Sequence, residues 1–237
     1  MQSIKVGKKT IFFDDTDGRH HFTDKQGNRI QSVTEFTGIL DKPALIPWAV
    51  NLAKTYLLGI IDRGEPITAG DIEEAAKQHR IIKKAGADIG TAIHDLVSKW
   101  IKNEKYDIPE DEKIRNGFNA FLNFQKEHRA TWLESEKIVY SPKHNYAGIL
   151  DAIAIVDGKM TLMDFKSSNG IWPEHQIQLG GYHLAYEEMT KKKIRQSMII
   201  RFSKDTGDFE FRIMSNPKQN QKAFLACVVI KRTLNNK

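Results

Sequence analysis

Two aspartates and a lysine, Asp151, Asp164 and Lys166, are the residues of this 237-residue chain whose types and spacing could do chemistry together. Between the aspartates stands Asp157-Gly158, with an apolar run on either side. That dipeptide favours a two-residue hairpin, because both central positions of a type I′ turn need positive φ. With that turn, the register places Asp151 directly across from Asp164. Side chains on a strand repeat every second residue, so Lys166 is predicted on the same face.

Two carboxylates opposed at about 5 Å repel each other unless a cation lies between them. Mg²⁺ and Mn²⁺ suit hard oxygen ligands, and such an ion at a phosphodiester activates a water and stabilises the charge that builds on the phosphate. Lys166 could orient that water or neutralise the developing charge. The alternative is that these aspartates are solvated edge residues, since a D-x-K tripeptide alone means little. The predicted cross-strand register supports the metal site about as well as the solvated-edge alternative, and both interpretations stay open at this point.

A wider series of residues surrounds this trio: His94 in GTAIHDLV, Gly148-x-x-Asp151, Asp164-Phe165-Lys166-Ser167 and Gln178-x-x-x-Tyr182. The series resembles the motifs of the PD-(D/E)XK nuclease superfamily in its RecB-like branch, closest in pattern to phage-type exonucleases and the mitochondrial genome-maintenance exonuclease. Ser32-Val33-Thr34 and residues 42–49 resemble an N-terminal feature of that group, so the resemblance covers most of the chain in scattered blocks. The chain departs from the namesake motif by having Leu150 in place of the first proline and Asp164 in place of the commoner glutamate.

The resemblance implies a role for each matching residue of the site. Asp151 and Asp164 would ligate the metal, with the main-chain carbonyl of Phe165 as a further ligand and Lys166 as the catalytic lysine. His94 would be the histidine ligand of the RecB-like branch, and an imidazole in the set favours Mn²⁺ over Mg²⁺ relative to an all-oxygen site. Taken alone, His94 lies in a helical run with an apolar side, a setting that favours a buried core histidine over a metal ligand.

Four further residues are predicted to contact substrate: Ser167, Trp172, Gln178 and Tyr182. Gln178 and Tyr182 are four apart on a helix and share a face, although they could simply pack against the sheet. Trp172 could stack on a base, but most tryptophans fill cores.

Two other features of this region carry expectations. Gly180 and Gly181 each cost the helix roughly 1 kcal/mol relative to alanine, which indicates close approach of another backbone or of substrate. Glu136, on the strand before the hairpin, is the remaining acidic candidate, and we expect it to be solvated.

Composition agrees with an enzyme acting on a polyanion. The chain is 40% hydrophobic with a net charge of +6, which suits DNA as a partner. The basic clusters 77–84 and 191–195 could contact phosphates or serve only solubility. The single cysteine, Cys227, excludes a four-cysteine iron–sulfur cluster built by this chain alone. We find no run of about 18 apolar residues and no apolar signal core, so we expect no membrane association and an intracellular, cytoplasmic location in a bacterial or phage-infected cell.

The elements that must position the site follow from periodicity and turn signals. We expect short strands at 3–13, 19–23 and 29–31, with turns at Asp17-Gly18 and Gln26-Gly27, and a capping box from Ser32 to Glu35. Helices are predicted at 46–59, 71–84, 88–103, 110–128, 174–190 and 217–234, and strands at 132–140, 147–156, 160–166, 195–202 and 208–214.

This order predicts an α/β fold. The resemblance implies a restriction-endonuclease-like core, with a central mixed β-sheet flanked by helices and preceded by an N-terminal β-hairpin and helical region. We expect one domain over 1–237, in which 1–87 holds the N-terminal strands and helices and 88–237 the nuclease core. Residues 62–88 are polar and are expected to be a mobile insertion, and the resemblance implies that they are the counterpart of a strand-guiding helical arch.

The function implied is a metal-dependent DNA exonuclease that prefers single-stranded ends, in replication, recombination or repair, with Mg²⁺ or Mn²⁺ as cofactor. One alternative is a structure-specific or restriction-type endonuclease, because the same site can cut internal bonds. Another is a nucleic-acid-binding subunit of a nuclease–helicase assembly, with a helicase or recombination protein as partner. The chain has no G-x-x-x-x-G-K-[ST] phosphate loop, so a motor would come from another chain.

Overall fold

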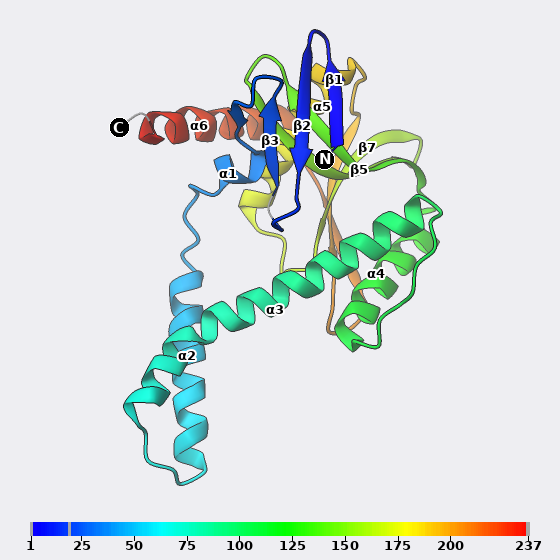
Figure 1. The fold of residues 1–237 in the computed structure, drawn as a ribbon. Helices are drawn as coiled ribbons and strands as arrows, with labels where there is room; N and C mark the ends of the chain where they lie inside the picture. The colour runs from blue at the N-terminus through cyan, green and yellow to red at the C-terminus, as the bar shows by residue number, and fades with distance from the viewer. Residues whose placement is uncertain (1, 19, 236–237) are drawn as a thin grey trace. The chain divides into compact units, whose positions relative to one another are not determined.

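The structure is a computed structural model that describes residues 2–18 and 20–235, and it contains helices and two β-sheets (Figure 1). The elements are β1 (Gln2–Val6), β2 (Lys9–Asp14), β3 (His21–Asp24), β4 (Arg29–Ile30), α1 (Val33–Thr37), α2 (Leu45–Asp62), α3 (Ala69–Ile101), α4 (Glu112–His128), β5 (Thr131–Ser141), β6 (Tyr146–Val156), β7 (Lys159–Lys166), α5 (Pro173–Thr190), β8 (Gln196–Phe202), β9 (Phe209–Ile213) and α6 (Pro217–Asn235). They fall into two compact units, one of residues 1–40 with 93–237 and one of residues 41–92.

A five-stranded mixed sheet is the centre of the larger unit. Its order is β5-β6-β7-β8-β9, and every neighbouring pair is antiparallel except β7 with β8. A parallel pair needs a crossover, and α5 supplies it. The predicted α/β class, with a central mixed sheet flanked by helices, is therefore confirmed.

The β6–β7 hairpin turns where the sequence predicted. Asp157 and Gly158 have φ values of 50° and 72°, which is the pair of positive angles that a type I′ turn requires. The ladder runs from Val156 opposite Lys159 to Ala152 opposite Met163. The turn and this register are as predicted, and the ladder ends one pair short of Asp151 and Asp164.

Helices cover the two faces of this sheet with different side chains. Ile153, Leu162 and Ile199 belong to one core cluster with Leu179 and Tyr186 of α5. On the other face, Phe165 and Phe202 lie 5.2 Å apart between ring centroids, and both contact Phe121 of α4. Because Asp164 alternates with Phe165 along β7, its side chain belongs to the face covered by α5.

The N-terminal strands form a second, antiparallel sheet in the order β1-β2-β3-β4. Its apolar residues Ile11, Phe13 and Phe22 share a core cluster with Ile138 and Tyr140 of β5. The prediction of one strand over 3–13 was wrong, because the chain reverses at Gly7, whose φ is 59°.

The predicted capping box is present at the start of α1. The main-chain N–H of Ser32 donates to Glu35 Oε2 at 2.8 Å, and the N–H of Glu35 donates to Ser32 Oγ at 3.2 Å. The box ends the N-terminal sheet region and begins a helix whose Val33 and Phe36 are fully buried.

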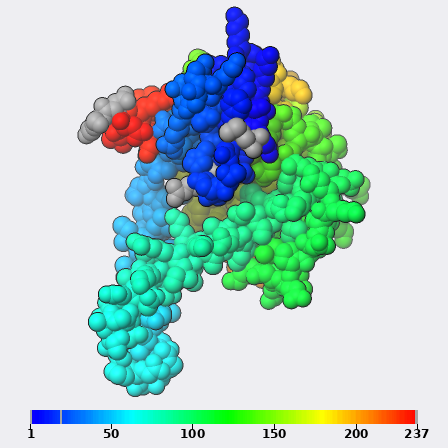
Figure 2. All heavy atoms as spheres, in the orientation of Figure 1, coloured from blue at the N-terminus to red at the C-terminus, as the bar shows by residue number. Residues whose placement is uncertain are grey.

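The smaller unit contains α2 and the first part of α3. Helix α3 is continuous where the sequence predicted two helices, 71–84 and 88–103, because Gly86 is accommodated inside the helix. Most of the segment 62–88, expected to be a mobile insertion, is therefore helical. Figure 2 shows one face of this unit in cyan. Its large apolar residues include several that are exposed: Leu45, Ile46, Val50, Leu58, Ile61, Ile67, Ile72, Ile81 and Ile82. No helix of the described residues is long and apolar enough to cross a membrane.

Gly180 and Gly181 permit α6 to lie against α5. A Cβ at Gly180 would stand 2.7 Å from the main-chain carbon of Asn220, and one at Gly181 would stand 2.7 Å from the Phe224 ring. The close approach that the sequence predicted is thus that of another helix.

Gly180→Ala is expected to destabilise the protein by about 1–3 kcal/mol, because the added methyl group meets main-chain atoms that cannot rotate away. The matched control is Gly59→Ala in α2, where the nearest atom is a flexible arginine tip at 3.9 Å. That change is expected to stabilise by roughly 1 kcal/mol through helix propensity. Urea unfolding measures both, and equal effects of the two variants would contradict the close contact.

Candidate metal centre

Three acidic side chains stand in one row across three neighbouring strands. In the β5–β6 ladder, Ser135 is opposite Ala152 and Lys137 is opposite Leu150, and Glu136 and Asp151 lie between these two pairs with ligand atoms within 4.8 Å of each other. The β6–β7 register places Asp164 at the position opposed to Asp151 on its other side. The sheet therefore brings one carboxylate from each of β5, β6 and β7 together.

Asp151 is the middle member of this row. Its Oδ1 lies 3.4 Å from Nδ1 of His94 on α3, and its Oδ2 accepts a hydrogen bond from the main-chain N–H of Phe165. Burial alone would raise the pKa of Asp151, but His94, Lys166 and the Phe165 N–H outweigh it and lower that pKa. Burial likewise opposes protonation of His94, while Asp151 and Glu136 raise its pKa. The pair therefore favours a carboxylate beside an imidazolium when no metal is present.

Asp164 is 2% exposed and is held by Lys166. The lysine Nζ lies 2.6 Å from Asp164 Oδ2, an ion-pair distance, although the geometry leaves that oxygen without a hydrogen bond. Burial raises the pKa of Asp164 to about 6, with Asp151 adding to the rise and Lys166 opposing it. Asp164 Oδ2 thus retains unsatisfied acceptor capacity.

Glu136 corrects a prediction, because the sequence favoured a solvated side chain. Burial and the charge of Asp151 raise the pKa of Glu136 to about 7, while His94 opposes the rise. Its φ is +49°, a left-handed conformation that is uncommon for a residue other than glycine. An irregularity between Trp132 and Glu134 disturbs the alternation along β5, so counting from the start of the strand misplaces Glu136. Counting back from the Ser141–Tyr146 pair could have found it.

These residues fit a divalent cation. Ligand atoms of His94, Glu136 and Asp151 all lie within 4.8 Å of one another. One imidazole and two carboxylates form a donor set that binds ions such as Mn²⁺. The raised pKa values of Glu136 and Asp164 mark carboxylates that burial and mutual repulsion penalise, and a cation relieves both penalties. Asp164 is outside the group of three and adjoins it across the β6–β7 ladder.

The predicted substrate-contacting residues differ in their placement. Tyr182 packs against Gly148, where an added Cβ would stand 2.6 Å from the ring, and its hydroxyl accepts a hydrogen bond from Gln178 at 3.3 Å. Burial raises the pKa of Tyr182, and the nearby charges of Asp164 and Asp151 add to that rise. This pair therefore lies beside the acidic row.

Ser167 and Trp172 lie on the segment between the row and α5. Ser167 is half-buried directly after Lys166, and Trp172 is 47% exposed immediately before α5. The Trp172 ring lies 3.3 Å from the position that a Cβ on Gly170 would take. This ring is therefore accessible from solvent.

The acidic row predicts a pH dependence of stability in the metal-free protein. The folded pKa of Asp164, about 6, is above its ordinary 3.8, so the folded state holds the proton more tightly than the unfolded state. Stability is therefore fully present below about pH 4 and falls as the pH rises to about 6, by on the order of 3 kcal/mol. Asp164→Asn is expected to remove the part of this loss of stability that the titration of Asp164 causes. Urea unfolding at pH 4 and pH 7 in EDTA measures it, and an unchanged fall in the variant would contradict the assignment.

Among known proteins, the matches to this chain are solved structures. No protein-family model matches the sequence, and no curated protein does. The solved structures that match include an alkaline exonuclease, LHK-Exo, from Laribacter hongkongensis, at 11% identity and a TM-score of 0.38 over 87% of this chain and 93% of that one. LHK-Exo in complex with dAMP matches at the same identity and TM-score over 87% and 94%. A protein called SSO0001 matches at 14% identity and 0.30 over 48% and 56%. At such values the chemistry of this chain rests on its own residues.

Proposed function

We propose that this protein is a metal-dependent nuclease that hydrolyses DNA phosphodiester bonds, as an exonuclease acting on single-stranded ends in replication, recombination or repair. The observation that carries the proposal is the row of Glu136, Asp151 and Asp164 with His94 at one side and Lys166 at the other. No packing requirement explains this many ionisable groups on one partly buried face. Along the chain, a helix is followed by three strands, a second helix and two further strands. The resemblance to PD-(D/E)XK nucleases implies this order of elements, so the order supports the proposal.

His94, Glu136 and Asp151 would hold Mg²⁺ or Mn²⁺, with Asp164 and the Phe165 carbonyl as the further ligands that the resemblance implies. When bound, the ion supplies activation of a water and stabilisation of charge on the phosphate. Asp164 holds the ammonium group of Lys166 at the row, where it can orient the water and stabilise negative charge. The Phe165 N–H fixes one oxygen of Asp151 and leaves the other facing His94.

Substrate contacts are proposed on two parts of the chain. Gln178 and Tyr182 lie beside the acidic row, and Ser167 and Trp172 follow Lys166, so a scissile phosphate and its base could be held there. In the smaller unit, α3 carries the basic cluster of 77–84, which suits the backbone of a single strand. A strand-guiding role for 62–88 belongs to the proposal.

Timed digestion of three labelled substrates in Mn²⁺ tests the function. We expect a linear single strand to be shortened from an end, its duplex form to be cut more slowly, and a closed circular single strand to resist. Cutting of the circle would favour the endonuclease alternative. Binding without cutting of any substrate would favour a subunit that works only within a nuclease–helicase assembly.

A further inference from the structure

Strand β9 is the outer strand of the central sheet at the end opposite β5. The N–H of Ser203 donates to the carbonyl of Asp208, and the N–H of Met214 donates to the carbonyl of Ser197. Opposed residues in an antiparallel pair alternate between bonded and unbonded, and the register fixes which are which. The main-chain groups of Phe209, Phe211 and Ile213 therefore point away from β8, and no strand among residues 2–18 and 20–235 pairs with them.

This edge is also apolar and exposed. Phe211 is 39% exposed and Ile213 is 49% exposed. Phe211 packs edge-on against His128 of α4, with 5.0 Å between ring centroids, and Phe209 packs on Phe124 at 5.5 Å. The rings are thus fixed in place while part of their surface stays open. An exposed, apolar, unpaired edge is the kind of surface to which another extended segment adds.

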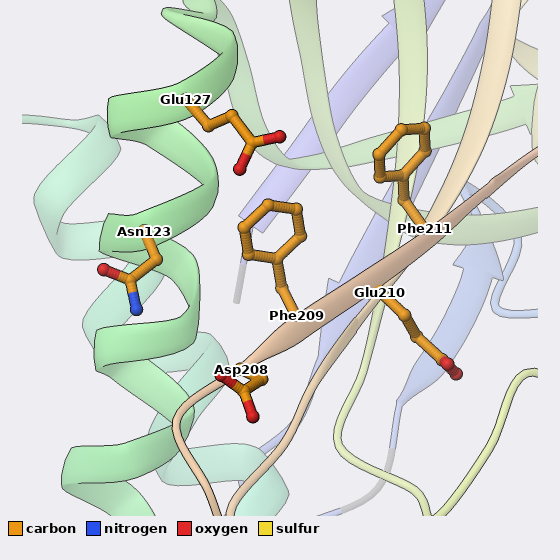
Figure 3. A pocket seen from close by; sticks show the side chains of 6 residues that line it. All are labelled: Asn123, Glu127, Asp208, Phe209, Glu210 and Phe211. Atoms are coloured by element: carbon orange, nitrogen blue, oxygen red, sulfur yellow. The ribbon is translucent and has the colours of Figure 1, made fainter.

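A cavity of about 470 Å³ opens beside this edge, between α4 and β9. Figure 3 shows Glu127 pointing from α4 towards the ring of Phe209, with Asp208 at the start of the strand. The cavity is lined by Asn123, Glu127, Asp208, Phe209, Glu210 and Phe211. Its lining therefore combines aromatic rings with carboxylates and includes no lysine or arginine.

The carboxylates of this cavity are not all neutralised by the protein. Glu210 is paired with Arg201 at 2.8 Å, whereas Glu127 has only the histidine ring of His128 at 3.7 Å. Within the described part of the chain, no side chain is paired with the carboxylate of Asp208. Negative charge next to aromatic rings attracts a lysine or arginine side chain. It also repels DNA, so the cavity suits a different partner from the one proposed for the acidic row.

We propose that the edge of β9 is a docking site for an extended, basic segment of a partner protein. The segment adds to the sheet through the main-chain groups of Phe209, Phe211 and Ile213, and one lysine or arginine side chain enters the cavity between Glu127 and Asp208. Main-chain pairing supplies affinity and the acidic cavity supplies selection for a basic residue. The five residues of β9 match a segment of about 17 Å in extended form.

Fluorescence anisotropy with a labelled ten-residue peptide of alternating threonine and arginine tests this site on the full chain. We expect the double variant Glu127→Gln, Asp208→Asn to bind the peptide at least about 10-fold more weakly than the wild type does. A peptide with citrulline in place of arginine should bind the wild type as weakly as the arginine peptide binds the double variant. Glu110→Gln with Glu112→Gln, on the exposed segment before α4 and in its first turn, is the matched charge control and should leave binding unchanged.

A separate variant tests whether the peptide pairs with β9 as an added strand. The N–H of Ile213 faces outward, so Ile213→Pro removes an outward donor and no bond to β8, and is expected to weaken binding at least about 5-fold relative to Ile213→Ala. Equal binding by the arginine and citrulline peptides would overturn the proposal. So would equal binding by Ile213→Pro and Ile213→Ala, or full displacement of the peptide by low concentrations of spermidine, which would indicate a site for small cations.

Discussion

Asp164→Asn and Lys166→Ala are each expected to lower the rate of DNA hydrolysis by at least about 1,000-fold without loss of the fold. Asp164 is buried with a raised pKa, so its carboxylate costs folding free energy in the metal-free protein, and an amide of the same shape should not destabilise it. Lys166 is 17% exposed and its ammonium pairs with that carboxylate. The measurement is digestion of an end-labelled single strand in Mn²⁺, together with thermal unfolding of each variant.

The same hairpin supplies matched controls. Asp157→Asn changes an exposed turn aspartate at φ 50°, a conformation that asparagine tolerates. Lys159→Ala removes an exposed lysine at the start of β7. Both should retain wild-type activity. Wild-type rates in purified, folded Asp164→Asn or Lys166→Ala would refute the assignment of these residues.

Removal of divalent metal is the second change with a large expected effect. Excess EDTA should abolish hydrolysis, and added Mn²⁺ should restore it, because the carboxylates of the row cannot activate a water without a cation. The imidazole of His94 predicts that Mn²⁺ restores more activity than Mg²⁺ at equal concentration. Initial rates after dialysis, with each metal titrated back, measure the effect.

The control for chelation is DNA binding by the same metal-free sample, which should persist through the basic surface. Hydrolysis that survives excess EDTA and is indifferent to added Mn²⁺ would contradict a metal-dependent reaction.

The local geometry of the site was predictable because a short turn determines a long register. Asp157-Gly158 leaves little choice of turn type, and each further pair down to Ala152 and Met163 follows by counting, without any tertiary information. The metal-binding and catalytic roles of these residues stay predictions.

Other features could not be read from local pattern. Glu136 was expected to be solvated, and the residues it lies beside, His94 and Asp151, come from a helix and another strand, which local pattern does not bring together. The continuity of α3 across Gly86 depends on the context of a 33-residue helix, in which one glycine costs about 1 kcal/mol. The chain reversal at Gly7 was not predicted, because the residues before and after this glycine together resemble a single strand.

The helix that carries Gln178 and Tyr182 illustrates an intermediate case. Gly180 and Gly181 predicted a close approach, which the packing of α6 confirms, yet glycine alone could not tell another helix from substrate. Only the position of Asn220 and Phe224, far along the sequence, resolves that choice.

Titration of Mn²⁺ into the metal-free protein, followed by the electron paramagnetic resonance signal of the free ion, tests the central claim most directly. The account predicts that the wild type and Asp157→Asn remove Mn²⁺ from solution equally, and that Asp151→Asn and Glu136→Gln weaken binding at least about 10-fold. Equal Mn²⁺ binding by all four proteins, or none by the wild type, would contradict a metal centre built from the acids of β5 and β6.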